Sequence, residues 1–287
     1  GAGAAGKWQD AATGEHGDLL DLIAAARRLS SLADVLAEAR SFQSMPDRPP
    51  PPTMQKPARN SVEAARRLWA SAVPITGTLA ETYLRNRGIA VDIGLTALRF
   101  HPRCYWVSSD GNSRRALPAM LAAVIDNDGV LTGLQRTWLS RDGGKADVDS
   151  PRRAMGQLLG NAVRFGYQGR TAVIAEGIET ALSVRTLMPQ STIAAALSAA
   201  NLERFRFWRG LRRLQIAHDN DVAGRASAER LHDRAKAACI RSRQLTPHLS
   251  DWNDDLVRLG EAECRHRLTQ NITPAIIHYS CDTLRCL

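Results

Sequence analysis

Hydrophobic positions change their spacing along the chain, and these changes divide it into segments. Near the N-terminus they recur at helical spacing, which predicts an Ala-rich helix from Leu19 to about Leu29 and a second helix from Leu32 to about Phe42. Six prolines between Pro46 and Pro57 exclude a regular helix and predict an extended linker over residues 46–60. We therefore expect a small helical segment, residues 1–45, ahead of the main body.

The first half of the main body, residues 61–167, mixes helices with hairpins. A helical pattern opens it, and a further helix is expected from Leu79 to Asn86. The runs Leu117–Ile125 and Leu131–Leu139 flank the turn at Asp128-Gly129, an arrangement typical of a β-hairpin. The pattern therefore predicts an α+β subdomain built on an antiparallel sheet.

After Gly166, short apolar strands alternate with helices. The pattern predicts strands at residues 172–175, 192–197, 213–218 and 243–246, and helices at residues 178–187, 222–238 and 254–268. Such alternation is typical of a parallel sheet with right-handed crossovers, here over residues 168–268. The predicted fold class is α/β: a parallel sheet flanked by helices, preceded by the α+β subdomain and the helical N-terminal segment. Residues 269–287 have no clear pattern.

Two of the predicted strands end in carboxylates. Glu176 follows the first strand after Gly166, and Asp219 and Asp221 follow the third. Because ligands of parallel sheets collect outside the C-terminal ends of the strands, we expect these three acids beside one crevice. Glu176 alone would equally suit the positive end of a helix dipole. Two like charges as close as Asp219 and Asp221, however, need a counter-cation.

Oxygen ligands of this kind favour Mg²⁺ or Mn²⁺, because Mg²⁺ binds one or two carboxylates and completes its shell with water and substrate phosphates. A third acidic group follows the last predicted strand, at Asp251, Asp254 and Asp255. We expect Asp251 to reach the same metal site and Asp254 to cap the last helix.

The charge of the chain favours a nucleic-acid partner, with solubility alone as the alternative. Thirty-eight Lys and Arg residues stand against 29 Asp and Glu, which gives a formal net charge of +9. The five cysteines are scattered and form no C-x-x-C pair, so neither a zinc site nor a disulfide framework is expected. No apolar run reaches the roughly 18 residues of a membrane span, so we expect a cytoplasmic protein without membrane contact.

Residues 203–213 carry five arginines against a single glutamate, with Phe205, Phe207 and Trp208 between them. Basic and aromatic residues together suit single-stranded nucleic acid, through charge attraction and base stacking. The alternative is a segment whose aromatic side chains pack inward while its arginines are solvated. The candidate contacts are Arg204, Arg206 and Arg209.

Several separated motifs carry a family resemblance. Ala175-Glu176-Gly177 followed by Asp219-Asn-Asp221 resembles the signature of Toprim domains, which bacterial-type primases, topoisomerases and some nucleases share. The phrases IAEGIETALS, AALSAANL, IAHDNDVAG and DWNDDL resemble the Toprim domains of plasmid- and phage-type primases, over about residues 171–260. Upstream, GLQR at residues 133–136, Lys145 and the stretch 150–166 resemble the first subdomain of the primase core. There the basic positions face phosphates, so the resemblance places Arg136 and Lys145 opposite the acids, with Arg152 and Arg153 as weaker candidates.

The resemblance implies a primase that joins ribonucleotides on a single-stranded DNA template, for a plasmid, phage or other mobile element and beside a replicative helicase. Glu176, Asp219 and Asp221 would be its catalytic residues, and with Asp251 they would hold Mg²⁺ or Mn²⁺; Glu176 would serve as a ligand or as a general acid/base. The stretch GKWQDAATGEHGDLLDLI resembles the sequence that follows a primase zinc ribbon, whose cysteines and histidines are missing here. The alternatives are a Toprim nuclease and a non-catalytic DNA-binding module of a truncated replication protein.

Overall fold

The computed structural model describes residues 7–9, 16–44, 58–91 and 95–270, which fall into two compact units, residues 1–55 and 56–287. In the first unit, β1 (Lys7–Gln9) pairs antiparallel with β2 (His16–Asp18), followed by α1 (Leu19–Arg27) and α2 (Leu32–Ser44). The two helices confirm those predicted from the hydrophobic spacing. The predicted linker lies outside the described residues up to residue 57, but its last part is wrong, because residues 58–60 already belong to the helix α3 (Ala58–Ala70). The tail lies outside the described residues from residue 271 onward.

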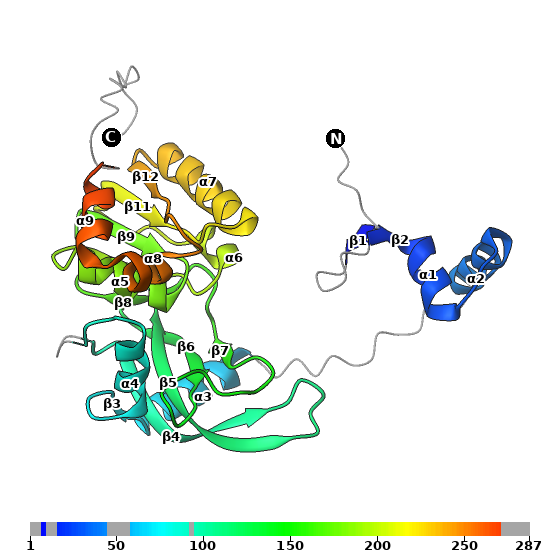
Figure 1. Cartoon of the computed structure of the whole chain (residues 1–287), viewed down its shortest axis with the longest axis horizontal. Coiled ribbons are helices and arrows are strands. Elements are labelled where there is room, and N and C mark those ends of the chain that lie inside the picture. Colours follow the sequence, from blue (N-terminus) through cyan, green and yellow to red (C-terminus); the bar gives the residue numbers. More distant parts are fainter. Residues whose placement is uncertain (1–6, 10–15, 45–57, 92–94, 271–287) are drawn as a thin grey trace. The chain divides into compact units, whose positions relative to one another are not determined.

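The second unit, called the core unit below, is built on one mixed sheet (Figure 1). The strands of its antiparallel part are β3 (Val73–Pro74), β4 (Leu98–Val107), β5 (Arg114–Ile125), β6 (Leu131–Trp138), β7 (Arg152–Gly156) and β8 (Ala162–Phe165). Those of its parallel part are β9 (Thr171–Ala175), β10 (Thr192–Ala195), β11 (Arg213–Ala217) and β12 (Arg241–Leu245). The predicted antiparallel and parallel halves and the α/β class are therefore confirmed.

One strand joins the two halves of the sheet. β8 pairs antiparallel with β10 on one side and with the end of β5 on the other, so the order β12-β11-β9-β10-β8-β5-β4-β3 is continuous. β6 extends the sheet from β5, and β7 pairs with β6. The division into subdomains at residues 61–167 and 168–268 stays a prediction, because the sheet is not interrupted between them.

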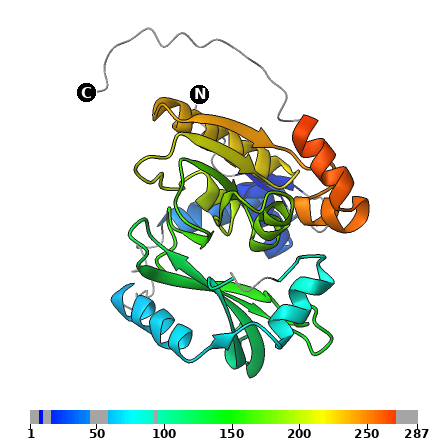
Figure 2. The same cartoon turned by 90° about the vertical axis from the view of Figure 1, so that its left-hand side faces the viewer.

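Helices cover both faces of this sheet (Figure 2). On one face, α4 (Leu79–Asn86), α5 (Ile178–Leu187), α8 (Trp252–Leu259) and α9 (Glu261–Gln270) share a single apolar core that spans both halves. On the other face, α6 (Ala199–Leu202) and α7 (Val222–Ala237) cover the parallel part, and α3 (Ala58–Ala70) covers β6 and β7. The shared core fixes the parallel strand ends relative to the β6–β7 hairpin, and this is what positions the site.

The last predicted helix is wrong in one respect. Instead of one helix over residues 254–268, α8 ends at Leu259 and α9 starts at Glu261. Gly260 lies between them with φ of 82°, in the left-handed region that glycine adopts without steric cost, and so it ends α8. None of the described helices has the length and apolar character needed to span a bilayer.

Candidate active site between the strand ends and the basic hairpin

The acids that follow β9 and β11 meet at one edge of the sheet. Ala175 and Ala217, the last residues of these two adjacent strands, lie opposite each other in the parallel register. The Glu176 N–H donates to the Ala217 carbonyl at 3.1 Å, and the Glu176 carbonyl accepts from the Leu197 N–H at 2.7 Å. The backbone of Glu176 is thus hydrogen-bonded on both sides, to the end of β11 and to Leu197 after β10, just before α5 begins. This agrees with the expectation from the strand ends.

Negative charge is concentrated here and only partly compensated, because the charge of Arg152 lowers the pKa of Asp219 but does not outweigh the effects that raise it. Burial raises the pKa of Glu176 to about 7, and the carboxylates of Asp219 and Asp221 add to the rise. The Oε2 atom of Glu176 is buried and has no hydrogen-bond partner among the described residues. Burial also raises the pKa of Asp219 to about 6, together with the charge of Asp251, although the Thr180 hydroxyl donates to Asp219 Oδ1 at 3.3 Å. These carboxylates repel one another.

This donor set fits a divalent cation. It consists of oxygen atoms, and a cation would relieve both the mutual repulsion and the unpaired Glu176 oxygen. Within the described part of the chain, however, no group of three or more His, Cys, Asp or Glu residues is close enough to form a complete metal centre. The acids would therefore supply only part of a coordination shell, as Mg²⁺ commonly accepts from a protein, with water and phosphate supplying the rest.

Two of the predicted metal ligands also begin helices. Asp221 accepts from the Gly224 N–H at 2.6 Å and caps α7. Asp251 accepts from the Asp254 N–H at 2.7 Å and caps α8. The prediction that Asp254 is the cap is therefore wrong, because Asp251 has the extended backbone of an N-cap residue and Asp254 lies in the first turn. A cap uses one carboxylate oxygen, so the predicted metal role of Asp251 stays a prediction.

Two residues that sequence reasoning passed over bring Asp251 to the site. Asn220, between the two aspartates, donates from its side chain to the Leu249 carbonyl at 3.0 Å and from its N–H to the Ser250 carbonyl at 2.8 Å. The buried carboxylate of Asp255 accepts from the N–H groups of His248 and Leu249, each at 2.7 Å. Together they hold the loop before α8 against the end of β11. The signal in the sequence was an amide between two acids.

Gly224 allows α7 to approach the site closely. An ideal Cβ at this position would lie 2.3 Å from the carbonyl oxygen of Asp219, closer than side-chain atoms ever come. The first turn of α7 therefore rests directly on the backbone of Asp219.

A buried carboxylate organises the basic side of the crevice. Glu179, with 8% of its side chain exposed, lies 3.9 Å from Lys145 Nζ and 3.7 Å from an Arg152 guanidinium nitrogen. It also accepts a hydrogen bond from the Tyr83 hydroxyl. Burial alone would raise the pKa of Glu179, but the Tyr83 hydroxyl and the two cations hold it below the ordinary value. Glu179 therefore stays ionised and anchors Lys145 and Arg152 on the acids' side of the hairpin.

The basic residues lie only partly where the resemblance placed them. Arg136 does not face the acids: its guanidinium lies 5.0 Å from the Trp138 ring, in the apolar cluster under α3. Gln135 and Arg152 line the crevice in its place. Side chains alternate between the two faces of a strand, so a displacement of one residue reverses the face. Lys145, by contrast, lies where the resemblance placed it, beside Glu179 and within the electrostatic influence of Asp251.

The aromatic residues of the 203–213 segment pack inward. Phe205 and Trp208 are 0% and 5% exposed, and the Arg164 guanidinium lies 5.8 Å and 5.2 Å from their rings. The hypothesis of base stacking is therefore wrong for these two side chains, and the alternative of inward packing is confirmed for them. The candidate contacts Arg204, Arg206 and Arg209 are exposed, so what this segment offers a nucleic acid is charge.

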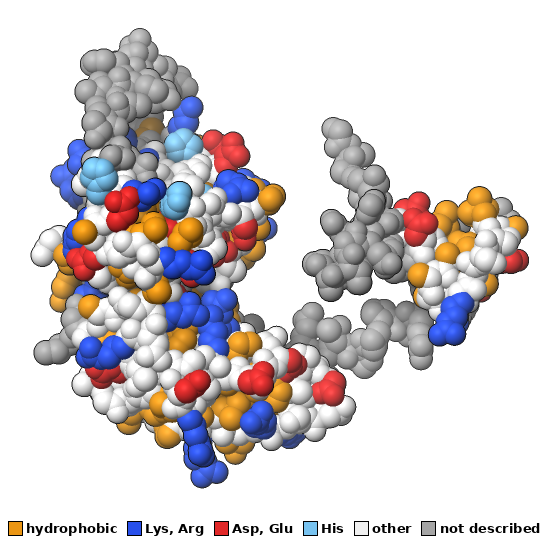
Figure 3. Space-filling model, in the orientation of Figure 1, with side chains coloured by type: hydrophobic (Ala, Val, Ile, Leu, Met, Phe, Trp, Pro, Cys, Tyr) orange, Lys and Arg blue, Asp and Glu red, His pale blue; other side chains and the backbone are white. Residues whose placement is uncertain are grey.

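The crevice itself is a cavity of about 470 Å³ lined by residues from both halves of the sheet, among them Gln135, Arg152, Leu197, Ser198 and Arg204. Leu197 joins it to the acids through its hydrogen bond to Glu176. Lys and Arg side chains gather at the waist of the core unit (Figure 3). The acids are not among the lining residues, but Arg152, which lines the cavity, lowers the pKa of Asp219 through its charge, so acidic and basic groups lie close together. Neighbouring groups of opposite charge suit the binding of a phosphate between a cation and the protein.

Comparisons with known proteins agree with this description. The family model of the Toprim domain matches residues 171–262, and that of a domain of unknown function, DUF7146, matches residues 59–165. A DNA primase domain from Pseudomonas aeruginosa is similar in structure, with a TM-score of 0.51, 16% identity and coverage of 73% of this chain and 78% of that one. The zinc-binding and RNA polymerase domains of the Aquifex aeolicus primase have a TM-score of 0.51, 15% identity and coverage of 89% and 71%. At these identities the similarity shows the fold. No curated protein sequence matches the chain.

Proposed function

We propose a function from one premise: the chain is a Toprim-domain protein with the fold of the DNA primase core. We infer that it is a primase-type nucleotidyltransferase, which joins ribonucleotides on a single-stranded DNA template. The observation that carries this proposal is the acid pair Glu176 and Asp219, whose pKa values are raised, within the electrostatic influence of Arg152. Arg152 lines the crevice and lies beside Glu179, as Lys145 does. Separate clusters of opposite charge suit a nucleoside triphosphate, whose phosphates need cations on both sides.

In the proposed reaction, the 3′-hydroxyl of the growing strand attacks the α-phosphorus of the incoming nucleotide. The new P–O bond forms as the bond to the bridging oxygen of the β-phosphate breaks, pyrophosphate leaves with its electron pair, and the hydroxyl proton passes to solvent. Lys145 and Arg152 would bind the phosphates and orient them, with Glu179 keeping both cations in place. Glu176 and Asp219, with Asp221 and Asp251 beside them, would hold the divalent cation. When bound, it supplies positive charge to the transferring phosphate and the leaving pyrophosphate.

A primer-synthesis assay on single-stranded DNA with labelled ribonucleotides and Mg²⁺ or Mn²⁺ tests the proposal. It should be run on this chain and on a form extended at its N-terminus. Asp219→Asn should abolish metal-dependent synthesis, whereas Asp233→Asn, an exposed aspartate on α7, should retain it. If Asp219→Asn synthesises primers like the unaltered protein, the proposed mechanism is wrong.

The same assay separates the alternatives. Cleavage of labelled DNA without nucleotides would indicate a Toprim nuclease, and salt-sensitive DNA binding without incorporation would indicate a non-catalytic module. Service to a plasmid, phage or other mobile element, action beside a replicative helicase and a cytoplasmic location stay predictions.

A further inference from the structure

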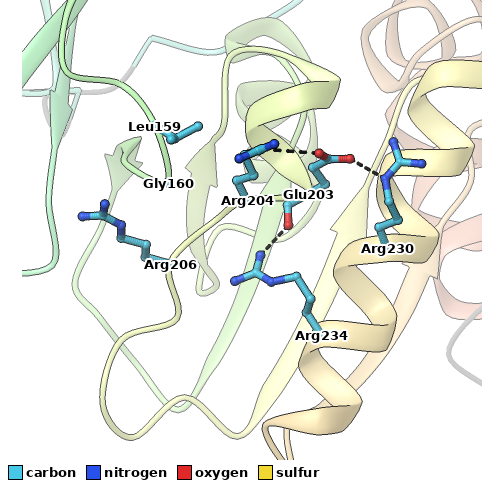
Figure 4. Close-up of a pocket in the computed structure, with 7 residues that line it drawn as sticks. All are labelled: Leu159, Gly160, Glu203, Arg204, Arg206, Arg230 and Arg234. Atoms are coloured by element: carbon cyan, nitrogen blue, oxygen red, sulfur yellow. Dashed lines mark hydrogen bonds and ion pairs between the residues drawn. The ribbon is translucent and has the colours of Figure 1, made fainter. Parts of the chain in front are cut away.

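A second basic pocket adjoins the crevice. It is a cavity of about 380 Å³ bounded by the loop before β8, the segment after α6 and the outer surface of α7 (Figure 4). Leu159 and Arg204 line both this pocket and the crevice, so the two are adjacent. The arginine pocket, as it is called below, owes its charge to Arg204, Arg206, Arg230 and Arg234.

The arginine pocket has an excess of positive charge. Four guanidinium groups surround one carboxylate, that of Glu203. Glu203 accepts from Arg230 and lies 3.5 Å from Arg204, while Arg234 donates to the Glu203 carbonyl rather than to its carboxylate. Arg206 has no ion pair or side-chain hydrogen bond among the described residues and lies apart from the other three (Figure 4). Three positive charges therefore lack a counter-ion within the pocket.

The floor of the pocket is built so that Arg206 is held in place. Gly160 has φ of 76°, and a Cβ there would lie 2.7 Å from Cγ of Arg206, so the arginine stem packs directly on the glycine backbone. The Arg206 N–H donates to the Gly160 carbonyl at 3.0 Å. The Gly160 N–H in turn donates to the buried Asn201 side chain at 2.7 Å. On the opposite wall, the Arg234 guanidinium lies 5.2 Å from the Phe207 ring, which limits its freedom.

We propose that the arginine pocket binds a backbone phosphate of the nucleic-acid strand that runs through the crevice. The inference rests on the proposed function, because it takes the crevice to hold that strand. Guanidinium groups bind phosphate oxygens through paired N–H donors, and the two cavities share Leu159 and Arg204, so a strand in the crevice would pass next to the arginine pocket. A free polyphosphate has the same chemistry and is the other source that the experiment must distinguish.

The test measures binding without ribonucleotides, by fluorescence anisotropy of labelled oligothymidylates of increasing length over a range of salt concentrations. For strands long enough to reach the arginine pocket, the dependence of log K on log salt should steepen by about 0.7 for each added phosphate contact. Arg206→Ala with Arg234→Ala should remove this steepening and leave short strands bound as before. Gly160→Ala, which displaces the Arg206 stem and keeps its charge, should do the same. Arg258→Ala, an exposed arginine on α8, should leave the slope unchanged.

Titration calorimetry with inorganic pyrophosphate distinguishes the two sources of phosphate. If pyrophosphate binding falls in the Arg206/Arg234 double variant while strands of every length bind with unchanged salt slopes, the pocket serves a free polyphosphate and the strand assignment is overturned. Unchanged binding of both probes overturns the pocket altogether. Primer synthesis retained in Asp219→Asn, with the length effect intact, overturns the proposed function and leaves the pocket assignment in place. Matching melting temperatures show that the variants are folded.

Discussion

Replacing Glu179 with glutamine tests whether this buried carboxylate holds the two halves of the site together. The substitution keeps the volume of the side chain and an oxygen that accepts from the Tyr83 hydroxyl. It removes only the negative charge that compensates Lys145 and Arg152. Glu179 lies on α5, and its partners lie on α4 and around the β6–β7 hairpin. The substitution should therefore lower the free energy of unfolding of the whole core unit.

The magnitude follows from burial and distance. Removing one partner from a buried charge pair costs roughly 3–5 kcal/mol, because the other charge is left unpaired. Here the cations are 3.7 Å and 3.9 Å away, and the Arg152 side chain is 48% exposed, so water offsets part of the loss. We expect a loss near the lower end, about 3 kcal/mol. For a domain of roughly 150–250 residues each kcal/mol changes Tm by about 2–4 °C, which gives a decrease of about 6–12 °C.

Thermal unfolding followed by circular dichroism measures this, with Glu263→Gln as the matched control. Glu263 lies 2.7 Å from Arg267, closer than Glu179 lies to either cation, but 43% of its side chain is exposed, and exposed pairs contribute only about 0–1 kcal/mol. If Glu179→Gln lowers Tm no more than Glu263→Gln, the carboxylate does not anchor the basic residues. Phosphate affinity at Lys145 and Arg152 should fall in the first variant only.

The dependence on pH provides a second check. The pKa of Glu179 in the folded protein lies below its ordinary value of 4.5, so the folded state favours the ionised form. Its contribution to stability is therefore fully present above the unfolded pKa and is lost as the pH falls through the lower, folded pKa. The Tm difference between the unaltered protein and Glu179→Gln should be constant above about pH 5.5 and shrink below about pH 4.5. A difference that grows on acidification contradicts the assignment.

Three further changes test the acid cluster. Asp219→Asn should stabilise the metal-free protein by about 1 kcal/mol, and so raise its Tm, because burial and the neighbouring carboxylates disfavour the ionised form of the partly exposed Asp219. It should also abolish the rise in Tm that MgCl₂ gives the unaltered protein, so an equal rise in both contradicts a metal role. Gly224→Ala should lower the free energy of unfolding by about 1–3 kcal/mol and remove most primer synthesis, because its Cβ collides with the Asp219 carbonyl. The control, Ala223→Gly, should lower the free energy of unfolding by about 1 kcal/mol and retain primer synthesis. Asn220→Ala should weaken Mg²⁺ binding, measured by calorimetry, about 10-fold or more, and unchanged affinity would separate the loop before α8 from the site.

The parallel half of the sheet was predictable because local signals agree there. The apolar run of β9 ends where Glu176 and Gly177 begin, and the α5 bounds match the prediction, because an extended residue must precede the helix and apolar side chains then face the sheet. Asp219 and Asp221 were placed by the same logic, since adjacent parallel strands bring their ends together. Where pattern and capping coincide, the sequence predicts both the element and the position of its last side chain.

The face of β6 was not predictable, because this strand is buried on both sides. Leu134 and Trp138 face the cluster under α3, while Gln135 and Thr137 are also buried, on the other side. Without polar and apolar alternation, nothing in the run shows which residues point to the crevice, and Arg136 was assigned to the wrong face. On a strand that is buried on both sides, the face to which a charged side chain points depends on what packs against each face. Those packing partners are distant in the sequence.

The role of Glu179 could not be predicted from the residues next to it in the sequence. In the motif EGIET, the role of Glu176 can be predicted because it directly follows a strand. Glu179 has the position of an ordinary acid in the first turn of a helix, where it would complement the helix dipole. Its partners are Tyr83, 96 positions earlier, and the cations Lys145 and Arg152 from the hairpin. An ionised group this deeply buried is stable only if those partners exist, so the carboxylate specifies how the basic hairpin must approach α5. The spacing between the acids and the basic residues is therefore set by a residue that was not among the predicted site residues.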